Sequence, residues 1–365
     1  MKQETIEKQI EAIREEIRKT PYHKGTEHYV GRLRAKIARF KDELLEKRLS
    51  GGGGGDGYAV GKSGNATVVL AGFPSVGKST LLNALTKANS KTAEYPFTTL
   101  SVVPGMMNYH GAKIQILDVP GLISGASAGR GRGKEVLSVM RTADLILFLI
   151  DGRKMTQLEK MKTELKKAGI RIDQKKPALI INKKNKGGIL IKNSSFLSGF
   201  SAETATGIAQ EFRLKNAEII IPADGIDEAK FIDALAGNRV YLPQLVVVNK
   251  RDLLTEKTIK KVREEWPDAV LISALKNEEL VELKKAIFRK LQLKRIYLKP
   301  IKAEPDYQEP LIMRGKVTVG RVRDYLTEEI SESKKAYLWG RSAKFARQLV
   351  GENHILADED VISFR

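Results

Sequence analysis

The sequence predicts an α/β protein whose main β-sheet is largely parallel and is covered by helices on both faces. Three observations support this fold class. Short apolar runs such as ATVVLAGF, which begins at Ala66, alternate with helical stretches such as KSTLLNALTKA. The runs are continuously apolar, as expected of strands that are buried on both faces of a parallel sheet. Each run ends in polar loop residues, and ligands bind such sheets at the carboxyl ends of their strands.

The composition and charge narrow the function classes. The chain has 365 residues, which is long for one domain, and 42% of them are hydrophobic, enough for real cores. The net charge of +20 favours a polyanionic partner such as nucleic acid, while a heat-adapted surface is the alternative explanation. No apolar run approaches the roughly 20 residues of a membrane span, so we expect a cytoplasmic protein without a membrane partner. The absence of cysteine excludes disulfides and thiolate metal sites.

Residues 1–50 are expected to form a helical hairpin. Apolar residues recur there at alternating spacings of three and four, which is typical of helices with one apolar stripe. Pro21 and Gly25 separate the two stripes, so we expect the helices to fold back and pack on each other. The glycine-rich segment 51–65 that follows is expected to be a flexible linker. The stripe residues are Ile6, Ile10, Ile13 and Ile17, then Val30, Leu33, Ile37, Phe40 and Leu44.

The rest of the chain divides into a sheet domain, an insertion and a C-terminal module. The sheet domain is expected to span 66–170 and 241–292, because far more residues separate ADLILFLIDG from LPQLVVVNKRD than one crossover helix needs. The insertion, 171–240, is expected to be a small α/β subdomain with a basic face, since 171–192 contain seven basic side chains and one acidic one. Residues 293–365 again combine candidate strands with one candidate helix and form the C-terminal module.

The segment GFPSVGKS, residues 72–79, fits the pattern G-x-x-x-x-G-K-[ST] and lies between a predicted strand and a predicted helix. Its glycines let backbone N–H groups curl around phosphates, Lys78 would reach the β- and γ-phosphates, and Ser79 would ligate magnesium. An ordinary glycine-rich turn is the alternative, and the position between strand and helix counts against it. The residues expected to contact a nucleotide here are Gly72, Phe73, Pro74, Ser75, Val76, Gly77, Lys78, Ser79 and Thr80.

A second phosphate-sensing element is DVPGLI, residues 118–123, at the end of another predicted strand. Asp118 can hold magnesium through water, and the Gly121 amide can sense the γ-phosphate. The segment YPFTTL between the two motifs offers Thr98 and Thr99, either of which can close on the magnesium ion when the γ-phosphate is present.

The segment NKRD, residues 249–252, is expected to select the base. The Asp252 carboxylate can accept hydrogen bonds from both N1–H and the exocyclic amine of guanine, a donor pair that adenine lacks. Asn249 would brace the loop or contact the base edge, while the Lys250 stem covers the base face. The later segment SAL offers a backbone amide to the guanine oxygen, and the order of all these motifs favours GTP over ATP. The residues expected to contact the base are Asn249, Lys250, Asp252, Ser273, Ala274 and Leu275.

On these residues, the chain resembles the developmentally regulated GTP-binding proteins, a branch of the Obg-related GTPases, over essentially its whole length. The blocks that carry the resemblance include GFPSVGKSTLLNAL, YPFTTLSVVPG, DVPGLISGASAGRGRGKEVL and GNRVYLPQLVVVNKRD. The resemblance implies a P-loop GTPase domain interrupted by an inserted small α/β subdomain and followed by a C-terminal β-grasp module called TGS. It also implies association with ribosomes or RNA and with a regulatory protein. By the family pattern, Thr99 rather than Thr98 is a magnesium ligand.

Leu122 follows the glycine of DVPG, where many GTP-hydrolysing switches have a glutamine that orients the attacking water. The resemblance implies that a hydrophobic residue is normal there. Distant relatives that recruit potassium beside the phosphates use an asparagine of the P-loop, and this chain has Ser75 instead, so a role for potassium stays open. Arg130, Arg132 and Lys134 in the adjacent glycine-rich stretch could move toward the phosphates or toward RNA, or form a mobile basic segment.

Two function hypotheses follow. The first is a GTPase that slowly hydrolyses GTP to GDP and phosphate with Mg²⁺ and acts as a switch on ribosomes or RNA, with K⁺ as an open second cofactor. The second is an RNA- or ribosome-associated scaffold whose GTP site is mainly structural, and the intact motif residues favour the first. GTP-coupled RNA modification ranks last because no second catalytic cluster is identifiable.

We expect a monomer that contacts RNA through Lys183, Lys184 and Lys186 of the insertion, with a further contact from the C-terminal module. The expected catalytic residues are Lys78, Thr99 and Gly121, and the expected metal ligands are Ser79, Thr99 and Asp118.

Overall fold

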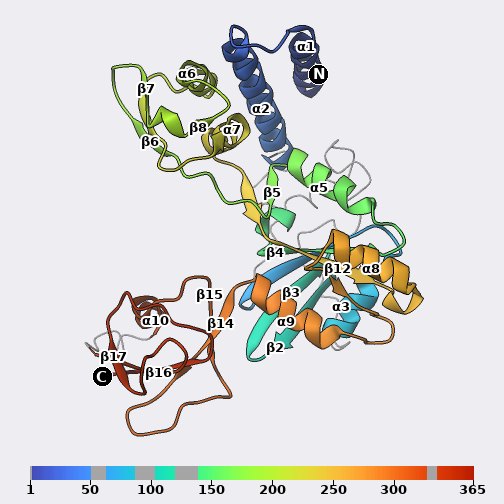
Figure 1. Ribbon diagram of the computed structural model, residues 1–365, viewed down its shortest axis with the longest axis vertical. Coiled ribbons are helices and arrows are strands. Elements are labelled where there is room, and N and C mark those ends of the chain that lie inside the picture. The colour runs from blue at the N-terminus through green and yellow to red at the C-terminus, as the bar shows by residue number, and fades with distance from the viewer. Residues whose placement is uncertain (1, 51–62, 87–102, 120–138, 327–334) are drawn as a thin grey trace. The chain divides into compact units, whose positions relative to one another are not determined.

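The computed structural model describes residues 2–50, 63–86, 103–119, 139–326 and 335–365 (Figure 1). By its internal contacts the chain divides into two compact units. The first, called the hairpin unit here, consists of 1–57 and 165–241, and the second, called the sheet unit, consists of 58–164 and 242–365. Among the described residues, no helix is long and apolar enough to cross a membrane.

The sheet unit contains a six-stranded sheet, whose strands are β1 (Ala66–Ala71), β2 (Val103–Tyr109), β3 (Ala112–Asp118), β4 (Leu145–Asp151), β12 (Gln244–Asn249) and β13 (Val270–Leu271). Their order across the sheet is β13-β12-β4-β1-β3-β2. All neighbouring strands are parallel except β2, which is antiparallel to β3 at the edge. Every residue of β1 and β4 is buried, which explains their continuous apolar runs. The mainly parallel α/β sheet predicted from these runs is confirmed.

Two helices, α3 (Lys78–Thr86) and α9 (Leu280–Lys290), pack on one face of this sheet (Figure 1). Leu82 of α3 and Leu283 of α9 are almost completely buried in one core with side chains of β1 and β4. Because α3 begins at Lys78, the helix starts directly at the predicted phosphate loop. The remaining elements around the sheet are α5 (Gln157–Lys167), the short 3-10 helix η3 (Arg251–Leu253) and α8 (Glu256–Glu265).

The C-terminal part of the sheet unit forms a second sheet. Its strands are β14 (Leu293–Leu298), β15 (Leu311–Arg314), β16 (Ala336–Trp339), β17 (Gln348–Val350) and β18 (Asp360–Phe364), in the order β15-β14-β18-β16-β17. The helix α10 (Val319–Tyr325) packs on one face, where Val319 and Val322 share a core with side chains of β14, β16 and β18. Thr318 caps this helix, because its side chain accepts a hydrogen bond from the Arg321 N–H.

The hairpin unit begins with the helices α1 (Lys2–Lys19) and α2 (Glu27–Ser50). Their apolar stripes pack on each other as expected, with Ile6 and Ile10 against Leu44. However, α2 has a second packed face that the sequence analysis did not predict. It contacts α6 (Ala202–Glu211) and α7 (Glu228–Ala236) of the inserted segment, and Ala35 lies in the core of that segment. Gly31 allows the close approach, since a Cβ atom there would lie 2.6 Å from Thr204 Cγ2.

The inserted segment contains a three-stranded sheet of β6 (Ile180–Lys183), β9 (Ala217–Ile220) and β7 (Ile189–Lys192), with β9 in the middle. The short strands β8 (Leu197–Ser198) and β10 (Ile226–Asp227) form a separate pair, and the 3-10 helix η2 (Ser194–Phe196) precedes β8. At the two ends of the insert, β5 (Ile170–Ile172) pairs with β11 (Val240–Leu242). The Val240 N–H donates to Gly169 O at 3.1 Å, so the insert begins and ends at neighbouring points.

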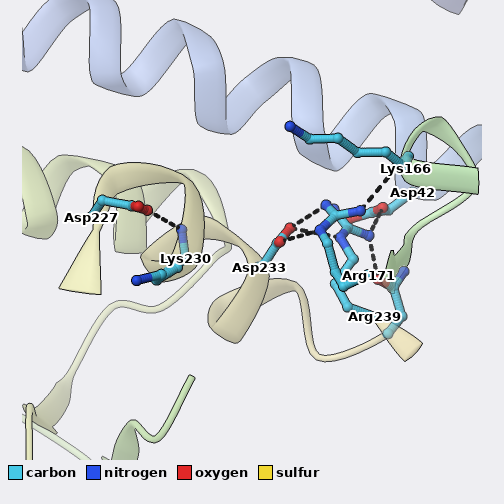
Figure 2. Close-up of polar contacts among 8 residues, drawn as sticks. Asp42, Lys166, Arg171, Asp227, Lys230, Asp233 and Arg239 are labelled. Carbon is cyan, nitrogen blue, oxygen red and sulfur yellow. Dashed lines mark hydrogen bonds and ion pairs between the residues drawn. The ribbon is translucent and has the colours of Figure 1, made fainter. Parts of the chain in front are cut away.

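A buried ion-pair network joins α2, α7 and both ends of the insert (Figure 2). Asp233 of α7 accepts hydrogen bonds from Arg171, at 2.5 and 2.7 Å, and from Arg239, at 2.9 Å. Arg239 also pairs with Asp42 of α2, and Arg171 donates to the Lys166 backbone oxygen at 2.9 Å. The four charged side chains are at most 13% exposed, so each depends on its partners to compensate its charge.

Candidate functional site

The predicted phosphate loop, residues 72–79, connects β1 to α3. Ser75 and Gly77 have positive φ angles of 61° and 97°. Such angles curl the backbone into the kind of concavity in which successive N–H groups bind an anion. Lys78 Nζ donates to the backbone oxygens of Gly72 and Phe73, both at 3.2 Å. The ammonium group is therefore held across the loop, close to the position where phosphates would bind.

Two glycines of this loop are required by close approaches of neighbouring strands. A Cβ atom at Gly72 would lie 2.6 Å from Leu149 O of β4, and one at Gly77 would lie 2.4 Å from Asn249 Nδ2 of β12. Neither neighbour can move away freely, because both belong to central strands of the sheet. The glycine pattern thus has a structural cause in this fold in addition to any role in phosphate binding.

Asn249 joins the phosphate loop to the segment expected to bind the base. Its Nδ2 donates to Val76 O at 2.8 Å, and its Oδ1 accepts from the Ala274 N–H at 2.9 Å. The residue is 3% exposed, so both hydrogen bonds are shielded from water. Of the two roles considered for Asn249, this geometry favours bracing the loops over contacting the base edge.

Lys250 is held by a carboxylate that the sequence analysis did not select. Its Nζ donates to Ser75 O at 2.9 Å and to Asp151 Oδ2 at 3.2 Å. Asp151 ends β4 and lies beside Asn249 in the sheet register. It also accepts from the Arg153 side chain at 2.6 and 2.9 Å, and these hydrogen bonds hold the pKa of Asp151 well below its ordinary value of 3.8, against the effect of burial. The sequence signal was available, because the aspartate of LIDG follows an apolar strand just as NKRD does.

The predicted base-binding residues lie in two adjacent loops after β12 and β13. Asp252 belongs to η3, its side chain is 12% exposed, and Lys276 Nζ lies 3.9 Å from its Oδ2. Ser273 is buried and accepts a hydrogen bond from the Lys276 N–H at 3.3 Å. Leu275 is 80% exposed, so its side chain is free to cover one face of a bound base. The two loops are tied together by the Asn249 hydrogen bond described above.

The predicted metal-binding side chains Ser79 and Asp118 contact each other. Ser79 Oγ donates to Asp118 Oδ2 at 3.0 Å, which places the first turn of α3 beside the end of β3. Asp118 is 6% exposed, and within the described part of the chain its Oδ1 is buried without a hydrogen-bond partner. A buried carboxylate oxygen with unused acceptor capacity next to a hydroxyl oxygen fits the hard oxygen ligands that Mg²⁺ prefers.

Several predicted functional residues lie outside the described part of the chain, so their placement stays a prediction. They are Thr98, Thr99, Gly121, Leu122, Arg130, Arg132 and Lys134. The structure brings together the other elements, because the phosphate loop, Asp118, the NKRD segment and the SAL segment all lie at the carboxyl ends of strands of one sheet.

A glycine-rich loop that is hydrogen-bonded to an NKxD segment at the carboxyl edge of a parallel sheet is the arrangement of a P-loop GTP-binding domain. Comparison with protein-family models agrees with this class. Residues 67–184 match the family described as "50S ribosome-binding GTPase", and residues 186–293 match the family described as "C-terminal region of MMR_HSR1 domain".

Curated relatives match this chain along nearly its whole length. Developmentally-regulated G-protein 3 of Arabidopsis thaliana is 40% identical over 365 residues, which covers 98% of each chain. Developmentally-regulated GTP-binding protein 2 of Bos taurus is 38% identical over 359 residues, again 98% of each chain. An uncharacterized GTP-binding protein of Methanocaldococcus jannaschii is 47% identical over 363 residues, 98% of this chain and 92% of that protein. The chain therefore belongs to the family of developmentally regulated GTP-binding proteins.

Among solved structures, the YchF GTPase of Schizosaccharomyces pombe aligns with 84% of this chain at 15% identity and a TM-score of 0.43.

Proposed function

We propose that this protein slowly hydrolyses GTP to GDP and phosphate with Mg²⁺ and acts in the cytoplasm as a nucleotide-dependent switch on ribosomes or RNA. The observation that carries the proposal is the double hydrogen bond of Asn249, which fixes the phosphate loop at Val76 and the base segment at Ala274. A preorganised site of this kind binds both ends of one nucleotide at little entropic cost.

On this proposal, Lys78 binds the β- and γ-phosphates, while Ser79 and Asp118 hold the magnesium ion. The Ser79–Asp118 contact and the unpartnered Asp118 Oδ1 support these roles. Thr99 is proposed as a further metal ligand and the Gly121 amide as the contact to the γ-phosphate. When bound, magnesium neutralises charge that develops on the phosphates during transfer.

Hydrolysis is proposed to be slow because Leu122 has no side-chain group that can orient water. Orienting water and stabilising the transition-state charge together contribute several orders of magnitude in rate, on the order of 10³–10⁵ in switch GTPases. That contribution must come from the backbone, a monovalent cation, a basic switch residue or a partner. Potassium is expected to help only if Ser75 and the loop backbone can replace the asparagine that relatives use.

The partner is proposed to be a ribosome or another RNA. The net charge of +20 and the exposed side chains of Lys183, Lys184 and Lys186 support a polyanionic partner, as does the match of residues 67–184 to the family described as "50S ribosome-binding GTPase". The C-terminal sheet with its helix α10 supports the assignment of 293–365 as a β-grasp TGS module. By family resemblance we also propose a regulatory protein partner, with the chain monomeric in isolation.

Single-turnover phosphate release from bound GTP tests the enzymatic part. The wild type is expected to release phosphate slowly, Lys78→Ala is expected to lose productive GTP binding with an intact far-UV circular dichroism spectrum, and Leu122→Ala is expected to change the rate little. Measurements in potassium and in sodium separate the cation contribution. Absence of any magnesium-dependent release, with tight GTP binding retained and with ribosomes present, would support the alternative scaffold role. A rapid basal rate that collapses in Leu122→Ala would contradict the proposed role of that loop.

A further inference from the structure

The face of the C-terminal sheet opposite α10 carries an aromatic side chain on β16, the strand beside the β17 edge. In β16, Ala336 and Leu338 lie in the core under α10, so the alternation of the strand directs Tyr337 to the opposite face. In the sheet register, Tyr337 lies between Leu349 of β17 and Ser363 of β18. Leu349 is 57% exposed, so this face is open to solvent along the β17 edge.

Two arginines stack on the ring of Tyr337. The guanidinium carbon of Arg347 lies 5.4 Å from the ring centroid, and that of Arg365 lies 5.3 Å from it. Within the described part of the chain, neither guanidinium has a carboxylate partner. Two other arginines of the C-terminal module, Arg295 of β14 and Arg323 of α10, also lie over aromatic rings, but each of them forms an ion pair. Among the described residues, two positive charges without a carboxylate partner thus lie against one ring at Tyr337.

The surroundings of these arginines are basic and partly apolar. Lys335 and Lys344 are exposed, and Phe345 is 64% exposed in the loop before β17. No carboxylate of the described residues pairs with either lysine. We call this region the Tyr337 surface, and its members are Lys335, Tyr337, Lys344, Phe345, Arg347, Leu349 and Arg365.

The Tyr337 surface combines positive charge with an exposed aromatic ring. This combination favours a flexible polyanion that carries planar aromatic rings. Guanidinium groups without a carboxylate partner bind phosphodiester oxygens through paired, charge-assisted hydrogen bonds. An exposed phenylalanine offers a stacking face, and bases are available for stacking on a protein only where the nucleic acid is single-stranded. An acidic peptide would satisfy the arginines but would leave the ring of Phe345 without a stacking partner.

We propose that the Tyr337 surface binds single-stranded RNA, with Arg347 and Arg365 on the phosphates and Phe345 stacked on a base. The inference rests on the proposed function, in which RNA or a ribosome is the partner. It assigns one contact to a surface on the C-terminal sheet, which is separate in sequence from the basic insertion.

Fluorescence anisotropy of the full chain with a labelled RNA of about 12 unpaired nucleotides tests the inference. The double variant Arg347→Gln and Arg365→Gln is expected to bind at least about tenfold more weakly at low salt, because charge-assisted hydrogen bonds are lost. The slope of log affinity against log salt is expected to fall by about 1.4, which is about 0.7 for each lost phosphate contact. The matched control is Lys257→Gln and Lys260→Gln, which removes two exposed charges from α8.

Phe345→Ala provides a second, charge-neutral variant. Because this ring is mostly exposed, its removal leaves the core intact, and binding is expected to weaken at least about fivefold through the lost stacking. Thermal melting and basal GTP hydrolysis should match the wild type for all variants. A duplex RNA of the same length should compete poorly with the single strand.

The outcomes separate this inference from the proposed function. If the wild type binds RNA and the Arg347/Arg365 variant binds as tightly as the α8 control, the Tyr337 surface is not the contact, while an RNA partner stands. If the wild type binds neither RNA nor ribosomal particles in any nucleotide state, the RNA part of the proposed function fails as well. If poly-glutamate competes as well as RNA and Phe345→Ala has no effect, the surface binds an acidic protein instead and the inference is wrong.

Discussion

Both polar atoms of the Asn249 side-chain amide are hydrogen-bonded. Its Nδ2 donates to Val76 O, and its Oδ1 accepts from the Ala274 N–H. Because both polar atoms of the Asn249 amide are used by the loops, we expect the carboxylate of Asp252 to discriminate between purines. The Asp252 side chain is only 12% exposed, so a hydrogen bond to a base there would be partly shielded from water. Asp151 completes the arrangement by holding the ammonium group of Lys250 against the phosphate loop.

The substitution Asp252→Asn is expected to reverse the hydrogen-bond polarity at the purine edge. Affinity for GTP should fall by roughly 2–5 kcal/mol, and xanthosine nucleotides should gain affinity, because the new amide can donate to the xanthine oxygen. Titration with fluorescent guanosine and xanthosine nucleotides measures both changes. Glu256→Gln, which removes an exposed carboxylate from the nearby α8, is the control. Unchanged GTP affinity in Asp252→Asn would mean that another residue recognises the base.

The sequence was sufficient to select most of the residues that the structure brings together, because each follows a strand with a strong local pattern. Asp151 was missed for a physical reason. Its contact with Lys250 exists because β4 pairs with β12, and no local periodicity encodes that pairing, whereas its contact with Arg153, two residues later, is local. Sequence motifs report the residues that would touch a ligand, whereas the side chains that position them appear only when the strands are placed side by side.

Among the secondary-structure elements, α2 shows why a helix can have more partners than its apolar stripe indicates. Its second face uses Gly31 and Ala35, and such small residues add almost no hydrophobic signal while allowing α6 to approach closely. The strand β17 is hard to predict from sequence for a similar reason, because three residues are too few to show an alternating pattern. The long buried strands were predictable because their whole length is apolar.

Glu27, at the start of α2, is expected to make the stability of the hairpin unit depend on pH. It accepts hydrogen bonds from the Ser201 N–H at 2.6 Å and from Thr204 Oγ1 at 2.9 Å. The hydrogen bond from the Ser201 backbone is the main reason that the pKa of Glu27 lies below its ordinary value of 4.5, with burial opposing it. A lowered folded-state pKa means that this stabilisation is present above the unfolded-state pKa and is lost as pH falls through the folded-state pKa.

The substitution Glu27→Gln is therefore expected to destabilise the hairpin unit near neutral pH and to lose its effect in acid. Urea unfolding of wild type and variant, measured from about pH 7 down to pH values below the ordinary carboxyl pKa, gives the difference in unfolding free energy at each pH. The difference should shrink as pH falls. A difference that stays constant across this range would show that the ionised carboxylate does not provide the stabilisation.

The buried network around Asp233 is expected to be the most sensitive point of the hairpin unit. Asp233→Asn leaves the guanidinium groups of Arg171 and Arg239 with too little compensating charge, which should lower the unfolding free energy by about 3–5 kcal/mol. Chemical denaturation followed by circular dichroism measures the loss. Asp224→Asn, at an exposed position of the same insert, should change stability by less than about 0.5 kcal/mol. Equal effects of the two substitutions would contradict the structural role of the network.

For the molecule as a whole, the excess of 64 basic over 44 acidic side chains is the feature most directly tied to a partner. Part of this charge is neutralised locally. In the insert, for example, Lys184 and Lys192 both pair with Glu218. The positive charge that remains without a nearby carboxylate among the described residues is therefore a property of particular surfaces rather than of the composition alone. On the insert, Lys183 and Lys186 contribute to this remaining charge.

Reversing Lys183, Lys184 and Lys186 to glutamate is expected to weaken association with ribosomal particles and to flatten its salt dependence. If each lysine contacts one phosphate, the slope of log affinity against log salt should fall by about 2–3. Sedimentation of the protein with ribosomes at several salt concentrations, in GTP and in GDP, measures both quantities. The control reverses Lys257, Lys260 and Lys261 of α8, which changes the net charge equally. If both variants behave alike, the insert makes no specific contact.

The neighbouring ends of the insert have a consequence for the history of this chain. Because Gly169 and Val240 are hydrogen-bonded to each other, the whole segment between them resembles a cassette that could be removed and the gap rejoined by a tight turn. Yet Ala35 of α2 lies inside the core of that cassette. A recombination event that transferred the insert without α2 would expose one apolar surface on α2 and another on the transferred segment. We therefore expect the N-terminal hairpin and the insert, although far apart in sequence, to be exchangeable between relatives only as a pair.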